Sequence, residues 1–241
     1  MVNRGRRMLW AALACVAIFL LSVVAYFDIY YRAGDAARRA LESDDCVRVG
    51  EAGDCIAFDG PGESAALVFY PGAKVEPTAY APLLNEVAAL GVDAFLVFPP
   101  LRMAIADIGA AGRVMAARDY PRWFLAGHSL GGVAAAQYAA KHPDRVEGLI
   151  LLGSYPTMVS PGLERLLSIY GSNDRILNLS NYEKQRAYWP ENSTERVIGG
   201  GNHAGFGDYG SQRGDGAAEI TAEEQRKLAA EAIAAFCNDA A

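Results

Sequence analysis

The chain has little of what several classes of protein require. It contains three histidines, His128, His142 and His203, and its four cysteines form no Cys-x-x-Cys pair. Such pairs build most structural zinc sites, so we expect no metal site. Basic residues are also scarce, because 22 Lys and Arg stand against 28 Asp and Glu, a net charge of −6. Nucleic-acid binders usually carry a basic surface, so the composition argues against that partner.

The overall composition is that of an ordinary globular protein. The 241 residues are 52% hydrophobic and 21% charged, which suits a chain long enough to bury a sizeable core. These values exclude a disulfide miniprotein, a collagen-like chain and a mainly disordered one. The sequence shows no internal repeat and no low-complexity tract.

The first thirty residues differ from the rest. Arg4, Arg6 and Arg7 precede an apolar run over residues 8–27 that holds no charge. About twenty helical residues extend roughly 30 Å, the thickness of the hydrocarbon core of a bilayer. We therefore expect residues 1–30 to form an uncleaved transmembrane anchor, and the alternative is a cleaved signal peptide. Further arginines follow the run, so the charge bias that would orient it is small.

Two cysteines bear on the compartment. Cys46 and Cys55 lie in a segment, CVRV then EAGD then CIAF, that is typical of a β-hairpin. A disulfide between them would suit a site outside the cytosol, and the alternative is two unbonded cysteines in the core. These observations favour a single-pass, membrane-anchored protein with an extracytoplasmic domain. We expect residues 31–45 to form a polar helical stalk and residues 46–241 to form the domain.

From residue 46 onward, short apolar runs alternate with longer amphipathic stretches. The apolar runs predict eight strands, at 46–49, 55–58, 66–70, 93–98, 123–126, 148–152, 166–170 and 195–198. The amphipathic stretches predict helices near 78–90, 103–118, 130–141, 178–188 and 221–237. Short apolar strands separated by helices indicate an α/β fold, with a mostly parallel sheet covered on both faces. The opening hairpin would add antiparallel strands at one edge.

The strongest local motif is Gly127-His128-Ser129-Leu130-Gly131. It follows the apolar segment WFLA and precedes an alanine-rich helical segment, which is the strand–turn–helix setting of a nucleophile elbow. Side chains at positions 127 and 131 would collide with the neighbouring strand and helix, so both positions need glycine. The motif predicts Ser129 as a nucleophile and the Leu130 amide as an oxyanion donor. The alternative is a glycine-rich turn without chemistry.

A serine hydroxyl is a poor nucleophile near neutral pH, so it needs a base, and the base needs an orienting acid. In this architecture the acid and then the histidine follow the serine, on loops after later strands. Asp174 follows the strand LLSIY, and His203 follows the strand ERVI on a glycine-rich loop. We therefore predict that Ser129, Asp174 and His203 form a triad.

The other candidate acids and bases are weaker. His128 adjoins the nucleophile on a tight turn, where its ring should point away from the serine hydroxyl and line the pocket instead. His142 lies before a proline at a helix end, where histidine commonly interacts with the helix dipole. Asp208 and Asp215 follow the histidine, which is the wrong order.

The loop after the third strand should supply the second oxyanion donor. It reads Pro71-Gly72-Ala73-Lys74, and its glycine lets an amide turn into the site. We favour Ala73 over Lys74 as that donor. Residues 153–165 alone separate the sixth and seventh strands, so no sizeable lid fits. A shallow pocket walled by loops follows, with His128, Arg102, Tyr155 and Phe206 as candidate wall residues.

The GHSLGG motif, with Asp174 and His203 after it in this order, resembles the α/β-hydrolase superfamily. The segments FYPGAKVEPTAYAPL, FPPLRMAIADI, LLGSYP, IYGSNDRI and GGNHAGFGDYGSQRGDG are similar to those of a fold-5-like subgroup of small, often membrane-anchored bacterial serine hydrolases of unassigned substrate. The resemblance covers nearly everything from about residue 46 and implies the fold. It implies little about substrate, because esterases, thioesterases, peptidases and non-enzymes share this fold. The chain departs from the pattern at Pro71-Gly72, where many esterases carry His-Gly.

Together these features predict a serine hydrolase that acts on a small ester-type substrate. Ser129 would attack the carbonyl, His203 would move the proton and Asp174 would hold the imidazole. The chemistry requires no metal and no organic cofactor. Two alternatives stay open. One is a membrane-tethered binding module on a hydrolase scaffold, and the other is thioesterase or cofactor-free haloperoxidase activity on the same triad.

Overall fold

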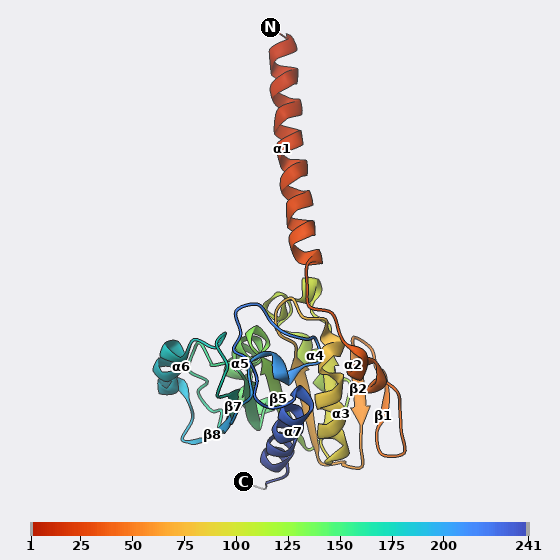
Figure 1. Ribbon diagram of the computed structural model, residues 1–241, viewed down its shortest axis with the longest axis vertical. Coiled ribbons are helices and arrows are strands. Elements are labelled where there is room, and N and C mark those ends of the chain that lie inside the picture. The colour runs from red at the N-terminus through yellow and green to blue at the C-terminus, as the bar shows by residue number, and fades with distance from the viewer. Residues whose placement is uncertain (1, 240–241) are drawn as a thin grey trace. The chain divides into compact units, whose positions relative to one another are not determined.

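The computed structural model describes residues 2–239, and the chain divides into two compact units, Met1–Tyr30 and Tyr31–Ala241 (Figure 1). The first unit contains one long helix, α1 (Val2–Asp28). The second unit contains every candidate functional residue named above.

The prediction of a membrane anchor at residues 1–30 is corrected by this structure. Within the described part of the chain, no helix combines the length and the apolar character that crossing a bilayer demands. The charged residues Arg4, Arg6 and Arg7 share α1 with the apolar run, and the helix ends at Asp28. The predicted membrane-anchored, extracytoplasmic location, which depended on that anchor, is therefore wrong.

Within the described residues of the second unit, eight strands form one sheet in the order β1-β2-β4-β3-β5-β6-β7-β8. The first two pairings, β1 with β2 and β2 with β4, are antiparallel, and all the others are parallel. The strands are β1 (Arg48–Glu51), β2 (Cys55–Asp59), β3 (Ala65–Tyr70), β4 (Asp93–Val97), β5 (Arg122–His128), β6 (Gly148–Leu152), β7 (Arg165–Gly171) and β8 (Asn192–Ile198). The predicted α/β fold, with an antiparallel hairpin at one edge, is confirmed.

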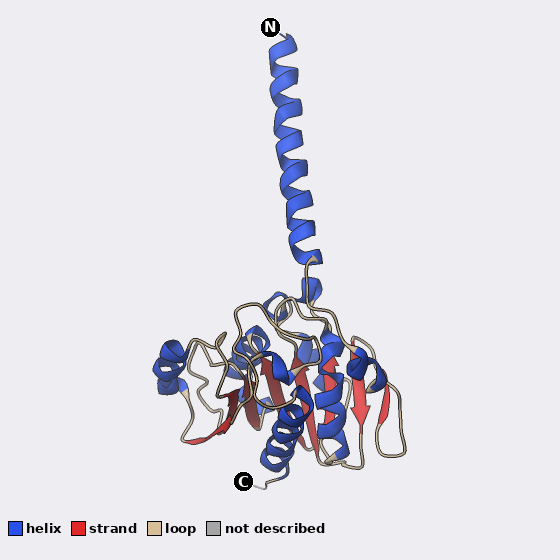
Figure 2. Ribbon diagram, in the orientation of Figure 1, coloured by secondary structure: helices blue, strands red, loops and turns tan. Residues whose placement is uncertain are grey.

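Helices cover both faces of the sheet, and Figure 2 shows two of them, α3 and α7, in front of it. The helices of this unit are α2 (Asp35–Arg39), α3 (Ala81–Ala89), α4 (Ala110–Ala116), α5 (Leu130–Lys141), α6 (Leu179–Gln185) and α7 (Ala222–Asn238). α2, α3 and α7 contribute to one buried apolar cluster, and α4 and α5 contribute to a second. The core is therefore in two layers, one on each side of the sheet.

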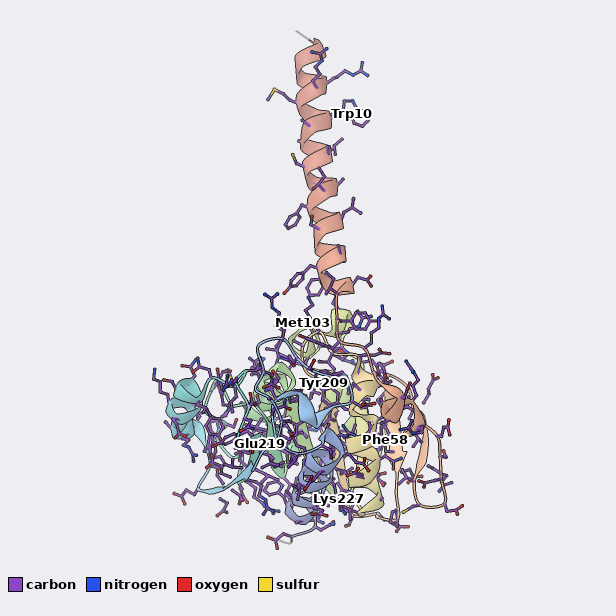
Figure 3. All side chains as sticks on the ribbon, in the orientation of Figure 1. Trp10, Phe58, Met103, Tyr209, Glu219 and Lys227 are labelled. Atoms are coloured by element: carbon purple, nitrogen blue, oxygen red, sulfur yellow. The ribbon has the colours of Figure 1, made fainter. Side chains whose placement is uncertain are left out.

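Strand β3 shows why the central strands have no polar alternation. Leu67 and Phe69 belong to the cluster under α3 and α7, whereas Ala66, Val68 and Tyr70 belong to the cluster under α4 and α5. Successive side chains of a strand point to opposite faces, and here both faces are covered, so all six residues of β3 are buried. Figure 3 labels two further members of the first cluster, Phe58 of β2 and Tyr209.

The hairpin forms, but its two cysteines are not bonded among the described residues. In its register Glu51 pairs with Ile56 and Arg48 pairs with Asp59, so Cys46 and Cys55 do not face each other across the strands. Cys46 is exposed, whereas Cys55 is buried with its thiol 3.2 Å from the Ala52 carbonyl oxygen. The register thus corrects the possible disulfide in favour of separate cysteines.

The segment 31–45, for which we expected a helical stalk, contains one short helix, α2, and contacts the loops that carry Val75 and Asp208. Tyr31 pairs with Val75 in a parallel bridge. The Ala37 side chain is fully buried, and its N–H donates to Asp208 Oδ2 at 2.8 Å. These contacts place the segment in the same compact unit as the sheet.

Candidate active site

Ser129 lies on a strained turn between β5 and α5. Its φ of 53° and ψ of −122° are unusual for a residue with a side chain. Its N–H donates to the Leu152 carbonyl at 2.9 Å, which ties the turn to the neighbouring strand β6. A Cβ at Gly127 would lie 2.3 Å from the Gly131 carbonyl carbon, and one at Gly131 would lie 2.1 Å from the Tyr70 oxygen. The turn therefore closes only with glycine at both positions.

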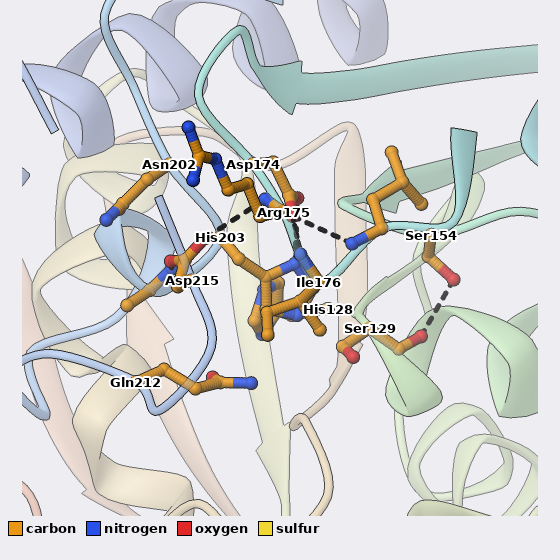
Figure 4. A network of polar contacts seen from close by, with 12 residues as sticks. His128, Ser129, Ser154, Asp174, Arg175, Ile176, Asn202, His203, Gln212 and Asp215 are labelled. Atoms are coloured by element: carbon orange, nitrogen blue, oxygen red, sulfur yellow. Dashed lines mark hydrogen bonds and ion pairs between the residues drawn. The ribbon is translucent and has the colours of Figure 1, made fainter. Parts of the chain in front are cut away.

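Asp174 and His203 meet beyond the ends of β7 and β8 (Figure 4). The Asp174 Oδ2 atom lies 2.8 Å from His203 Nδ1. Asp174 Oδ1 accepts hydrogen bonds from the N–H groups of Ile176 at 2.9 Å and Leu177 at 2.8 Å. Both side chains are buried. Because a carboxylate accepts, the proton lies on Nδ1 of the imidazole, and Nε2 is left as the acceptor.

Ser129 and His203 line one pocket. The His203 Nε2 atom is buried and has no hydrogen-bond partner among the described residues, so its bond to the Ser129 hydroxyl is not closed. Catalytic hydrogen bonds are often long until substrate binds. The structure thus gathers the three predicted residues, with the Asp–His contact made and the Ser–His contact open.

The loop that carries His203 is held by α7. Gln225 is 1% exposed, its Oε1 accepts the Asn202 N–H at 2.9 Å, and its Nε2 donates to the Asn202 carbonyl at 2.7 Å. The Ala204 N–H adds a hydrogen bond to Asp215 Oδ2 at 2.9 Å. We did not identify Gln225 from the sequence. The sequence feature that could have revealed Gln225 is its position four residues before Ala229 and eight before Ile233, which places a polar side chain on the buried face of α7.

Two backbone amides are available near the elbow. Neither the Ala73 nor the Leu130 N–H donates to any residue in the described part of the chain. The Lys74 N–H, in contrast, donates to the Arg102 carbonyl at 3.0 Å. The Ala73 loop is close to the elbow, because a Cβ at Gly131 would also lie 2.5 Å from the Pro71 oxygen. Ala73 is therefore a better candidate than Lys74 for the second oxyanion donor.

The pocket beside Ser129 has a volume of about 220 Å³. Its walls come from the start of α5 and from the loops after β6 and β7. They are Leu130, Val133, Gly153, Ser154, Tyr155, Ile176, Leu177 and Asn178, together with Ser129 and His203. A larger cavity, of about 920 Å³, is lined by residues of β7, β8 and α7 and contains none of these groups.

Of the four predicted wall residues, Tyr155 lines this pocket and the other three lie elsewhere. His128 is 1% exposed beneath the elbow, and the fully buried Phe206 ring packs 5.5 Å from it. Arg102 lies in the short 3₁₀ turn after β4 with a φ of 57°. The sequence did not identify Val133, because a wall residue of this kind resembles any core residue until the loops are placed.

The remaining histidine and acids have structural contacts. The His142 ring packs against Tyr138, with centroids 4.4 Å apart. Asp208 accepts a hydrogen bond from the Ala37 N–H in α2, and Asp215 accepts one from the Ala204 N–H in the His203 loop. Burial, and to a lesser extent the neighbouring His203, lower the pKa of His128 well below its usual value. Among the described residues, no cluster of His, Cys, Asp and Glu is able to hold a metal ion.

Comparisons with known proteins agree with this fold. A serine hydrolase-like protein of Danio rerio is 34% identical over 108 residues, which are 43% of this chain and 31% of that protein. The chain thus matches less than a third of the length of the curated relatives. Among solved structures, TT1662 from Thermus thermophilus is 18% identical with a TM-score of 0.59, over 80% of this chain and 99% of that chain. A novel esterase from Mycobacterium tuberculosis is 13% identical with a TM-score of 0.55, over 83% and 94%.

At these identities the solved structures show the fold alone, and the matches do not single out a membrane-anchored bacterial subgroup. The family assignment comes from the sequence model of the alpha/beta hydrolase family, which matches residues 66–227, more than half of the chain. That range begins in β3 and ends in α7, so it includes the elbow and both of the loops that carry Asp174 and His203. The chain belongs to the alpha/beta hydrolase family.

Proposed function

We propose that this chain is a serine hydrolase that transfers the acyl group of a small ester-type substrate to water. One observation carries the proposal. A serine on a strained turn shares a pocket with a buried imidazole whose Nδ1 is held by a carboxylate and whose Nε2 is unbonded. This is the arrangement that converts a hydroxyl into a nucleophile.

In the proposed reaction, Ser129 Oγ attacks the carbonyl carbon while His203 Nε2 takes the hydroxyl proton. Asp174 stays ionised and holds the imidazole through the 2.8 Å contact with Nδ1. The N–H groups of Leu130 and Ala73 would stabilise the negative oxygen of the tetrahedral intermediate. His203 then gives its proton to the leaving oxygen, and water, activated by the same imidazole, hydrolyses the acyl-enzyme.

The pocket supports a small substrate. Its volume of about 220 Å³ lies below the roughly 300–1,000 Å³ of typical small-molecule pockets. The aliphatic side chains of Val133, Ile176 and Leu177 form part of the wall, which suits a short acyl chain. We therefore expect turnover to be fastest for short-chain esters and to fall as the chain outgrows the pocket.

The direct test is Ser129→Ala, assayed with p-nitrophenyl esters of increasing chain length and with matched thioesters. We expect kcat to fall by about 10⁴-fold or more, because the nucleophile is removed. Ser211→Ala, which changes an exposed serine outside the pocket, is the matched control and should keep wild-type turnover. Circular dichroism would verify that both variants fold.

A fluorophosphonate probe separates an enzyme from a non-catalytic binding module on the same scaffold. Covalent labelling of Ser129 in the wild-type chain is the expected result, and the label should be absent from Ser129→Ala. Turnover that survives the substitution, or a wild-type serine that stays unlabelled and inactive toward esters and thioesters, would overturn the proposal.

A further inference from the structure

A second buried histidine, His128, lies between His203 and residues 71–74, which we call the oxyanion loop because it carries Ala73. The His128 Nδ1 atom lies 2.8 Å from the Tyr80 hydroxyl, and the Gly72 N–H donates to that same hydroxyl at 3.1 Å. Because the hydroxyl oxygen accepts from Gly72, its own hydrogen is available to donate to Nδ1. This arrangement leaves the proton of the neutral His128 ring on Nε2.

The other side of the His128 ring faces the candidate catalytic histidine. The ring centroids of His128 and His203 are 4.4 Å apart, with an angle of 46° between the rings. Phe206, three residues after His203, packs 5.5 Å from the same ring. His128 Nε2 is buried and makes no close hydrogen bond among the described residues, and the His203 backbone lies near enough to the ring to affect its pKa. The ring therefore serves as a wall against which the His203 imidazole lies.

Gly72, Tyr80 and His128 are closely packed. A Cβ at Gly72 would lie 2.7 Å from the Tyr80 hydroxyl oxygen and 2.9 Å from His128 Nδ1. Tyr80 is fully buried and also packs against Phe69 of β3, with ring centroids 5.0 Å apart. A shift of the Tyr80 hydroxyl would thus be felt by the loop that carries Ala73 and by the ring that supports His203.

The protonation states of His128 and Tyr80 suit their place beside His203. Burial, and secondarily His203, hold the pKa of His128 well below its usual value, and burial raises the pKa of Tyr80. Both groups are therefore neutral near neutral pH. A neutral His128 leaves the neighbouring His203 free to become positive when it takes the serine proton, whereas a charged ring at 4.4 Å would oppose that step.

We propose that Tyr80 and His128 are positioning residues that couple the oxyanion loop to the His203 imidazole, so that both are correctly placed for the same carbonyl. The inference rests on the proposed function and adds residues that touch no substrate. The coupling runs through one series of contacts, from the Gly72 N–H through the Tyr80 hydroxyl to the His128 ring and then to His203.

The test is a double-mutant cycle on the full chain with Tyr80→Phe and His128→Leu. We expect each single change to lower kcat by about 10- to 100-fold, as for misplacement near 1 Å, with KM changed less than about twofold. The double variant should be little worse than either single one, because both break the same chain of contacts. His128→Asn should retain more activity than His128→Leu, since its amide oxygen can accept from the Tyr80 hydroxyl.

Tyr182→Phe is the matched control. Tyr182 is also fully buried, and its hydroxyl also has two partners, Ser168 at 2.8 Å and Glu195 at 2.7 Å, away from the elbow. It should lose stability but keep kcat. Full kcat in Tyr80→Phe, or strictly additive losses in the cycle, would overturn the proposal. Where His128→Leu fails to fold, the kcat of Tyr80→Phe, compared with that of Tyr182→Phe, decides the matter on its own.

A second measurement does not depend on turnover. In nitrogen-15 NMR of the histidine rings, we expect wild-type His128 to be neutral with its proton on Nε2, and Tyr80→Phe to lose that preference and shift the His203 signals. Unchanged His128 and His203 signals in Tyr80→Phe would refute the coupling even if the chain hydrolysed nothing. An inactive wild-type chain with the expected signals would refute the proposed function instead.

Discussion

Replacing Gln225 with leucine removes the only two bonds that α7 makes, within the described residues, to the backbone of Asn202. These are the Asn202 N–H to Oε1 at 2.9 Å and Nε2 to the Asn202 carbonyl at 2.7 Å. Leucine keeps most of the buried volume, so the change is mainly chemical. The space leaves little freedom, because a Cβ at Gly205 would lie 2.1 Å from Oε1.

The expected magnitude follows from the two groups left unpaired. A fully buried backbone donor or acceptor without a partner costs about 1–3 kcal/mol. Because Asn202 is only half-buried, water recovers part of that penalty, and Gln225→Leu should lower the free energy of unfolding by about 1–3 kcal/mol. The Asn202 side chain still donates to the Gly216 carbonyl, and Asp215 still holds Ala204, so the loop should shift rather than unfold. Since His203 follows Asn202 directly, we expect kcat to fall by about 100-fold.

Urea unfolding and steady-state kinetics on the same preparations would measure both effects. Asn238→Ala is the control on the same helix, because its side chain donates to the Leu90 carbonyl at 3.2 Å on an exposed surface. That variant should stay within about 0.5 kcal/mol of the wild type with unchanged kcat. A Gln225→Leu variant that is destabilised but fully active would refute the view that α7 positions the base.

Two further predictions concern the elbow and its buried histidine. Gly131→Ala should abolish ester turnover and destabilise the fold, because the new Cβ would lie 2.1 Å from the Tyr70 carbonyl oxygen; Gly50→Ala, with no described atom within 4 Å of its Cβ, should be silent in the same assays. The pKa of His128 is lowered in the folded chain. At a pH below the ordinary histidine pKa near 6.5, the unfolded chain therefore binds a proton at His128 that the folded chain does not bind. The free energy of unfolding should therefore decrease as the pH is lowered below about 6.5, by up to about 1.4 kcal/mol per pH unit. Urea titrations at pH 7.0 and 5.5 would measure this slope, and His128→Asn should lose the part that His128 contributes. A slope identical to that of the wild type would contradict the assignment.

The strands were predictable where both faces are covered, because a doubly buried strand is a continuous apolar run. The strand expected at 195–198 begins at Asn192, since β8 is an exposed edge whose polar residues give no apolar signal. The helix expected at 103–118 is shorter, α4 (Ala110–Ala116), because residues 104–106 form a separate 3₁₀ turn and Asp107, with a φ of −147° and a ψ of 61°, leaves helical geometry. The disulfide and the membrane anchor failed for a common reason. Two cysteines close together in the sequence do not form a disulfide unless the strand register brings them face to face. Likewise, an apolar run does not show a membrane span unless the whole helix meets that requirement.

The turn at Ser129, and the order in which Asp174 and His203 follow it, could be read from the residues alone. A tight turn is specified by adjacent glycines, and a loop after a parallel strand always emerges at the same edge of the sheet. The groups that surround these residues, such as Gln225 behind the His203 loop and His128 against the imidazole, became known only from the folded chain. These contacts bring α7 and the end of β5 against the loop after β8, although β6 and β7 lie between β5 and β8 in the sheet. Packing between segments so distant along the chain is not written in any local pattern.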